Sequence, residues 1–262
     1  MKKQISTERL EAEKRFQANP SKCFQRHIRE VYGESEQKPK IESLKGAIVR
    51  RINHQEAATI ILRYEWLKTM AMCTVACFGL FIGSELLGAT CFTRGASFEA
   101  RACICGEEYA EKTICLARGA CVPHAPDNAA SFLIRHACRL ARKEFGWEIF
   151  FAYSDPSAGE VGTVYQAVGW IYLGSSLGRT QKFHTDFVKG DHRISTHNVK
   201  KTALRRGWTP EMGITKRKFL DDLGYTRVRT LDKAKWVWFE NKELRTKLID
   251  KPQPYPKRMH GV

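Results

Sequence analysis

The chain has 262 residues, of which 43% are hydrophobic and 11% aromatic, a composition that supports a buried core and excludes a disordered protein. Lys and Arg outnumber Asp and Glu by 44 to 28, so the formal net charge is +16 and a polyanionic partner is expected. The longest uncharged run, residues 69–84, is shorter than the roughly 20 apolar residues that span a bilayer, so no membrane span is predicted.

The positive charge is concentrated at the two ends of the chain. Residues 1–40 have a net charge of +4, residues 41–177 are neutral, and residues 178–262 have a net charge of +12. We therefore expect a charged N-terminal helix and linker, a catalytic core, and a basic segment that packs on the core and contacts nucleic acid. The alternative for the last part is a solvated basic tail without a partner.

The nine cysteines are an odd number, and most of them lie within apolar runs. The spacings Cys73–Cys77 and Cys103–Cys105 match no common pair of zinc ligands. No secretory signal peptide is recognisable at the start of the chain. The cysteines are therefore predicted to be reduced core residues of a cytoplasmic protein.

The first half of the chain contains two helix patterns and a hairpin pattern. Residues 6–16 begin with a Ser-Thr cap and predict a surface helix, which residues 33–40 follow as a linker. Apolar residues recur at helical spacing in residues 52–67. Residues 76–93 predict a β-hairpin with its turn at Gly83-Ser84.

Strand and helix patterns alternate from residue 112 onward. Strands are predicted at residues 112–122, 147–155 and 171–176, and helices at residues 131–146 and 162–170. A strand, loop, helix, strand order requires a crossover connection, so the sequence predicts a mixed, partly parallel sheet flanked by helices.

The basic segment has structural patterns of its own. A helix is predicted at residues 196–208, a helix capped by Thr215 and a strand at residues 214–228, and a further strand at residues 235–240 with Trp236 and Trp238 on one face. Cations for phosphates and flat rings for unpaired bases suit nucleic-acid contact. The candidate DNA-binding residues are Lys216, Arg217, Lys218, Arg227 and Arg229.

One stretch suggests acid–base chemistry. Asp155 ends a predicted strand, which places it on the usual ligand side of a parallel sheet. Gly159 and Gly162 allow a tight turn, and the following helix can return Tyr165 to the same cleft. Asp155 could accept a proton from an amine, and Tyr165 could protonate a leaving thiolate. The alternative is an aspartate that caps a turn and a tyrosine packed in the core.

These elements, ending in a Tyr-containing helix that closes on Gly-Trp, resemble the acyl-CoA-binding half of the GNAT acetyltransferase fold. More narrowly, residues 123–134, 153–174 and 254–258 resemble the Mom family of phage DNA modification proteins. The resemblance implies a GNAT-like α/β fold and an enzyme that adds a methylcarbamoyl group to N6 of adenine in double-stranded DNA. Such a modification would protect the DNA from restriction in the cytoplasm of a phage-infected or lysogenic bacterial host.

The resemblance also implies roles for individual residues. Asp155 and Tyr165 match residues implicated in activity, and Arg118 and Ser131 match positions implicated in acetyl-CoA binding. Since residues 123–130 contain no glycine, a pyrophosphate would rest on the N–H groups at the start of the next helix, assisted by Ser131 and Arg118. The alternative is that Ser131 caps that helix and Arg118 is a surface charge.

The match departs from the family pattern near the start of the fold. Tyr64 matches the tyrosine of a His-Tyr pair, but Arg63 stands in place of the histidine, and Glu65 is an additional candidate for the base. A metal ion such as iron is left open by the resemblance, and no sequence motif supports one. Two other functions stay open: a GNAT acyltransferase acting on another amine (a hypermodified pyrimidine, a tRNA or a protein lysine), and a non-catalytic DNA-binding protein with a GNAT-like fold.

Overall fold

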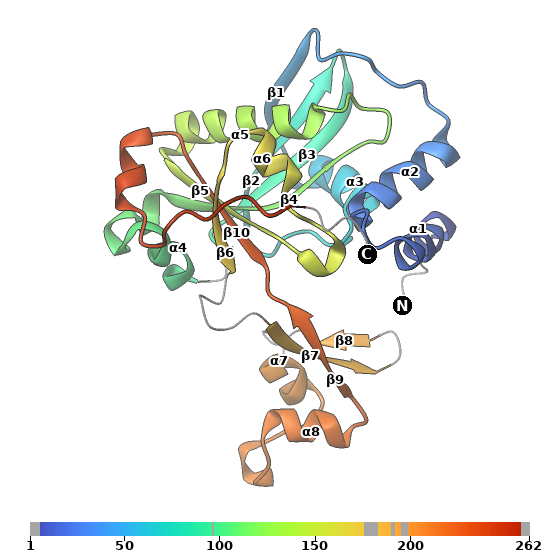
Figure 1. The fold of residues 1–262 in the computed structure, drawn as a ribbon, viewed down its shortest axis with the longest axis vertical. Helices are drawn as coiled ribbons and strands as arrows, with labels where there is room; N and C mark the ends of the chain where they lie inside the picture. The colour runs from blue at the N-terminus through green and yellow to red at the C-terminus, as the bar shows by residue number, and fades with distance from the viewer. Residues whose placement is uncertain (1–5, 96, 176–182, 190–191, 195–198, 258–262) are drawn as a thin grey trace. The chain divides into compact units, whose positions relative to one another are not determined.

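The computed structural model of the protein describes residues 6–95, 97–175, 183–189, 192–194 and 199–257 (Figure 1). The chain forms two compact units, one made of residues 1–174 and 234–262 and the other of residues 175–233. The segment that the charge pattern groups together, residues 178–262, is therefore divided between the two units.

A seven-stranded sheet forms the centre of the first unit, in the order β1-β2-β3-β4-β5-β10-β6. Its strands β4 and β5 run parallel, whereas the pairs β1/β2, β2/β3, β3/β4 and β5/β10 run antiparallel. The predicted mixed, partly parallel sheet is thus confirmed. The strands are β1 (Ala47–Ile52), β2 (Thr74–Ile82), β3 (Glu85–Thr93), β4 (Thr113–Cys121), β5 (Ile149–Ser154), β6 (Ile171–Ser175) and β10 (Ala234–Phe239).

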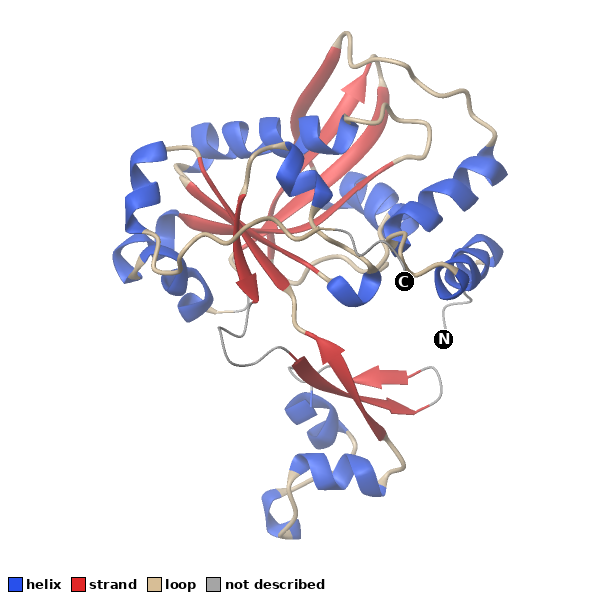
Figure 2. Ribbon diagram, viewed as in Figure 1, coloured by secondary structure: helices blue, strands red, loops and turns tan. Residues whose placement is uncertain are grey.

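Helices cover both faces of this sheet (Figure 2). Helix α5 packs against the face that carries Phe78 and Phe92, and α3 and α4 pack against the face that carries Cys91 and Cys115. The helices of the first unit are α1 (Thr7–Ala18), α2 (Phe24–Glu36), α3 (His54–Tyr64), α4 (Phe98–Cys105), α5 (Ala129–Phe145) and α6 (Thr163–Ala167), with 3-10 turns η1 (Glu107–Lys112), η2 (Pro156–Ala158) and η5 (Lys242–Lys247).

Most of the predicted elements of the first unit are confirmed, because each carries a local signal. The hairpin of β2 and β3 turns at Gly83-Ser84, and α5 ends at Gly146, whose φ of 73° is left-handed. Strand β10 buries Trp236 and packs Trp238 against the same cluster, as its alternating pattern predicts.

The N-terminal region differs from the prediction. Helix α1 begins at the predicted cap but is not purely a surface helix, because Arg9 and Ala12 are buried. Helix α2 was not predicted, and its last turn occupies residues 33–36, which the sequence assigned to a linker. Strand β1 was also missed, since Arg50 and Arg51 give it a charged appearance.

The second unit is built on a three-stranded sheet in the order β8-β7-β9. Its core contains Phe187, Ile194, Val199, Leu220 and Tyr225. In the sequence of residues 175–233, 14 Lys and Arg face 6 Asp and Glu, a net charge of +8 in 59 residues. The elements are β7 (Phe183–Lys189), β8 (His192–Ile194), α7 (Val199–Arg205), η4 (Pro210–Met212), α8 (Lys216–Asp222) and β9 (Thr226–Leu231).

The two predicted helices and the predicted strand of this unit correspond to α7, α8 and β9. Thr215 caps α8 through a hydrogen bond that its hydroxyl accepts from the N–H of Lys218, at 3.1 Å. Helix α7 falls within the predicted helix at residues 196–208, and residues 196–198 lie outside the described residues.

Candidate functional site

The parallel ladder between β4 and β5 stops before either strand ends. Its pairs run from Thr113 with Ile149 to Leu116 with Ala152, while β4 continues to Cys121. On the other side of β4, the register with β3 shifts so that Ala117 is an extra residue, a β-bulge. The carboxyl end of this strand pair, the usual ligand side of parallel strands, therefore contains an interruption in the sheet.

Glu65 is buried, with 6% of its surface exposed, and its charged surroundings include Arg118 from the bulged part of β4. It is the C-cap of α3, and its carboxylate accepts a hydrogen bond of 2.9 Å from the N–H of Leu67. Burial raises the pKa of Glu65 to about 7, although the positive charges of Arg118 and Arg9 favour the ionised form. A carboxyl group that titrates near neutral pH can accept a proton in catalysis.

Arg118 of β4 forms hydrogen bonds with the loop that contains Glu65. Its Nε donates to the carbonyl oxygen of Thr69 at 2.8 Å, and its Nη1 donates to the carbonyl oxygen of Ala117 at 2.7 Å. The guanidinium group is therefore engaged beside Glu65 rather than being a free surface charge. Its assignment to acetyl-CoA binding stays a prediction.

Tyr165 is packed in the hydrophobic core, with 9% of its surface exposed. Its ring lies 5.0 Å from that of Trp170 and 5.6 Å from that of Trp236, between centroids. Burial raises the pKa of Tyr165 well above its usual range, and the charges of Glu160 and Glu65 add to this effect. The phenol is therefore protonated at neutral pH and is a weaker acid than an exposed tyrosine. Its role as a proton donor stays a prediction.

The hydrogen bonds of the other two candidate catalytic residues, Asp155 and Tyr64, stabilise the fold. One carboxylate oxygen of Asp155 accepts hydrogen bonds from the N–H and hydroxyl of Ser157, at 2.9 and 2.5 Å, and so caps η2. The hydroxyl of Tyr64 donates to Glu36 in α2 at 2.6 Å. The first contact is local, whereas the second joins α3 to α2. Catalytic roles for these two residues stay predictions.

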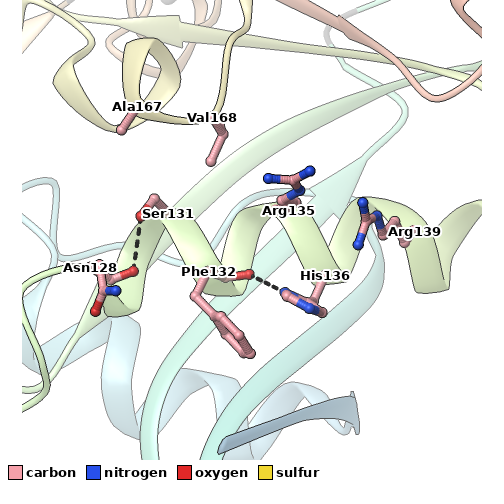
Figure 3. Close-up of a pocket in the computed structure, with 8 residues that line it drawn as sticks. All are labelled: Asn128, Ser131, Phe132, Arg135, His136, Arg139, Ala167 and Val168. Carbon is pink, nitrogen blue, oxygen red and sulfur yellow. Dashed lines mark hydrogen bonds between the residues drawn. The ribbon is translucent and has the colours of Figure 1, made fainter. Parts of the chain in front are cut away.

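An open hollow of about 270 Å³ lies along the N-terminal half of α5. Figure 3 shows Ser131, Arg135 and Arg139 on the side of α5 that faces the end of α6. Helix N–H groups and arginines one turn apart suit an anion such as phosphate. Of the residues around the hollow, only Ser131 was predicted. The lining residues are Asn128, Ser131, Phe132, Arg135, His136, Arg139, Ala167 and Val168.

Sequence reasoning missed the two arginines although a signal was present. Arg135 and Arg139 are four residues apart on the exposed side of a helix that was itself predicted. Ser131 donates its hydroxyl to the carbonyl oxygen of Asn128 at 2.9 Å, which is a local contact of the first helical turn.

The cations of the second unit are arranged around aromatic rings and acids. Lys216 lies 4.4 Å above the ring of Trp208. Arg227 pairs with Asp221 and Lys218 pairs with Asp222, whereas Arg217 is exposed. Part of the predicted DNA-binding charge is therefore neutralised within the unit.

The described part of the chain offers no metal site and no membrane span. Within it, no three His, Cys, Asp or Glu side chains stand close enough to hold a metal ion, so the residues do not fit an iron site. No helix in the described ranges is long and apolar enough to cross a bilayer. None of the nine cysteines forms a disulfide bond, and six of them are buried in the core.

The Mom protein family matches residues 47–257 of the chain. No curated protein matches it. Similar solved structures include an acetyltransferase from Bacillus subtilis in complex with CoA, with 13% identity, coverage of 74% of this chain and 97% of that chain, and a TM-score of 0.39. A GNAT family acetyltransferase from Elizabethkingia anophelis with acetyl-CoA bound has 9% identity, coverage of 74% and 98%, and a TM-score of 0.39. A spermidine N-acetyltransferase from Vibrio cholerae has 9% identity, coverage of 77% and 98%, and a TM-score of 0.41.

The raised pKa of Glu65 predicts a pH-dependent effect on stability. Folding raises this pKa from 4.5 to about 7, so the protein loses stability as the pH rises through that window and the buried carboxyl must ionise. Each pKa unit corresponds to about 1.4 kcal/mol, so the stability gained by Glu65→Gln should be larger at pH 8 than at pH 4.5 by about 3 kcal/mol. Urea unfolding at both pH values measures the difference. The exposed Glu42→Gln is the control, and an equal effect of Glu65→Gln at both pH values would contradict the raised pKa.

Proposed function

The chain belongs to the Mom protein family, and we propose that it is an enzyme that adds a methylcarbamoyl group to the N6 amine of adenine in double-stranded DNA. It would draw on an acetyl-CoA-type donor and protect the DNA from restriction. The observation that carries this proposal is the buried Glu65, whose pKa of about 7 suits a general base.

The hollow beside α5 supports an acyl-CoA donor. Arg135 and Arg139 supply two positive charges, and Ser131 lies at the first turn of the helix. A nucleotide-linked thioester carries several phosphates, which helix N–H groups and guanidinium groups bind well. When bound, such a donor supplies an activated carbonyl carbon for attack by an amine.

Glu65 and Tyr165 provide the two proton transfers of such an attack. The amine nitrogen forms a bond to the thioester carbonyl carbon and loses a proton, which the Glu65 carboxylate accepts. The carbon–sulfur bond breaks, and the leaving thiolate takes the proton of the Tyr165 hydroxyl. A base matters here because the lone pair of adenine N6 is delocalised into the ring. This transfer alone yields N6-acetyladenine. The methylcarbamoyl group contains one NH more, so a nitrogen donor must also take part, together with a two-electron oxidant if that nitrogen is at the oxidation level of ammonia.

The second unit supports DNA as the substrate. It holds half of the net charge of the protein in 59 residues, and Arg217 is exposed on its surface. Phosphate neutralisation by such cations gives binding that does not depend on sequence. To react in a closed site, the adenine would leave the base stack, as in other enzymes that modify bases.

Loss of either proton-transfer group should abolish most of the modification. Glu65→Gln and Tyr165→Phe should each lower the rate by about 100-fold or more, because each keeps the shape of the side chain but removes the acid or base. Wild-type activity should rise with pH through about 7, as the pKa of Glu65 requires. Mass spectrometry of nucleosides from co-expressed DNA measures the product and distinguishes methylcarbamoyl from acetyl adenine.

Two further variants sharpen this test. Glu42→Gln changes an exposed carboxyl and should leave the rate unchanged. Asp155→Asn separates the two candidate bases. If it abolishes modification at an unchanged melting temperature while Glu65→Gln is fully active, Asp155 is the base and the assignment to Glu65 is wrong.

The hollow predicts which residues bind the donor. Arg135→Ala, Arg139→Ala and Ser131→Ala should each weaken acetyl-CoA binding, the arginines by about tenfold, since each provides a charge-assisted hydrogen bond to phosphate. Isothermal titration gives the affinities. Lys143→Ala is the matched control, because Lys143 is an exposed cation of α5 that does not line the hollow. Unchanged affinity for acetyl-CoA in all three variants would contradict the assignment of the donor site to this hollow.

The second unit predicts salt-dependent DNA binding. Reversal of charge at Lys216, Arg217 and Lys218 to Glu should weaken binding and reduce the slope of log affinity against log salt by about 0.9 for each phosphate that the variant no longer neutralises. A control with the same change in net charge reverses the exposed Lys45, Lys143 and Lys242 of the first unit. An equal loss of affinity in both triple variants would show that total charge, not this surface, determines binding.

A further inference from the structure

The N-terminal part of the chain, residues 6–41, precedes the residues that match the family, yet it contacts loops at the proposed active site. These loops are residues 65–70 after α3, residues 122–128 before α5, and residues 155–162 after β5. The first contains Glu65, the second leads to Ser131, and the third contains Asp155.

Two side chains of this segment hold the end of α3. Arg9 of α1 donates from Nη1 to the carbonyl oxygen of Glu65 at 3.2 Å and from Nη2 to the carbonyl oxygen of Trp66. Gln25 of α2 accepts a hydrogen bond of 2.9 Å from the N–H of Trp66 and donates to the carbonyl oxygen of Tyr64. The last carbonyl groups of a helix lack partners within the helix, so these two side chains determine how the chain leaves α3.

Arg9 is well placed for this role because it is itself fixed. It is 7% exposed, and its guanidinium carbon lies 4.7 Å from the centroid of the Phe24 ring. Its charge also pairs with Glu13 at 3.6 Å. A buried, stacked guanidinium group can hold two carbonyl groups with little freedom to move.

The same segment packs against the other two loops. The N–H of Ile41 donates to the carbonyl oxygen of His124 at 2.9 Å, and Lys40 pairs with Asp127 at 2.7 Å. Gly159 lies so close to α2 that a Cβ atom there would be 3.0 Å from the Cα of Cys23. The N-terminal segment therefore touches all three loops.

Several groups face the carboxyl of Glu65 from the surrounding elements. Arg118 and Arg9 favour its ionised form, whereas burial opposes it. The groups in its electrostatic environment are Arg9 from α1, Leu67 N–H from its own loop, Cys91 from β3, Arg118 from β4 and Tyr165 from α6. Arg9 thus acts on Glu65 both through the backbone and through its charge.

We propose that residues 6–41 position Glu65 for proton transfer, with Arg9 and Gln25 as the positioning residues. This inference rests on the proposed function of Glu65 as the base. A base must be held close to its productive position, and a displacement of the order of 1 Å can cost about 100-fold in rate. Arg9 and Gln25 provide the hydrogen bonds from α1 and α2 to residues 64–66, and the ring of Trp66 also packs near that of Phe24, at 6.5 Å between centroids.

The test compares Arg9→Met and Gln25→Met, which keep much of the side-chain volume but remove the hydrogen bonds. Each should lower kcat by about tenfold or more with the KM for acetyl-CoA unchanged, because the base is displaced and the donor site is not. In Arg9→Met the pKa of Glu65 should be higher, because the positive charge of Arg9 stabilises the Glu65 carboxylate in the wild type. The rise of activity with pH should therefore move to higher pH. Arg9→Lys should restore the position of this rise.

Arg15→Met is the matched control. Arg15 also lies in α1 and pairs with Glu11 and with Glu34 of α2, so its loss weakens the helix pair without touching the loop. This variant should match the wild type in kcat and pH profile. Kinetics and a pH profile that are unchanged in both Arg9→Met and Gln25→Met would overturn the proposal.

Hydrogen exchange separates this inference from the proposed function. Amide exchange in peptides covering residues 64–70 should be faster in Arg9→Met and Gln25→Met than in the wild type and Arg15→Met. If the wild-type protein modifies no DNA, the proposed function fails, and exchange alone decides the structural role. Faster exchange then supports the positioning role of residues 6–41, and unchanged exchange overturns it.

Discussion

Glu65 is buried at the end of α3, and a buried carboxyl costs free energy unless charges and hydrogen bonds offset it. The surrounding elements provide this compensation. Arg118 comes from the bulged part of β4, Arg9 comes from α1, and the N–H of Leu67 comes from the loop itself. Because the offset is partial, the pKa of Glu65 is held at about 7, where the group can exchange protons at neutral pH.

The other groups of the proposed site come from elements around the end of the ladder between β4 and β5. On one side of the sheet, α5 offers Ser131, Arg135 and Arg139 around a hollow suited to phosphates. In the proposed mechanism, Glu65 and Tyr165 have opposite proton-transfer roles. The family match covers these residues, whereas Arg9 and Gln25 lie before it. In the proposed mechanism, donor binding and base positioning thus depend on different parts of the chain.

The sequence predicted the elements whose signals are local. The Gly83-Ser84 turn, the closing Gly146 and the alternation in β10 each lie within a few residues of what they determine. Helix α2 was missed although Phe24, Ile28 and Val31 follow a helical pattern, because its N-cap is Cys23 and Gly33 lies near its end. For the site, Glu65 was only an additional candidate. Its raised pKa arises from burial, and its surroundings include the charge of Arg118 and a hydrogen bond from Arg9, residues that are distant in sequence and cannot be seen in a local pattern.

The most direct test is a titration of the Glu65 side chain itself. Carbon-13 NMR of protein labelled at the glutamate carboxyl groups follows each ionisation, and the resonance of Glu65 is identified by its absence in Glu65→Gln. The account predicts that this carboxyl titrates with a pKa of about 7 in the folded protein. A midpoint near the ordinary value of 4.5 would contradict it, because Glu65 would then be an ordinary carboxylate and not a base suited to neutral pH.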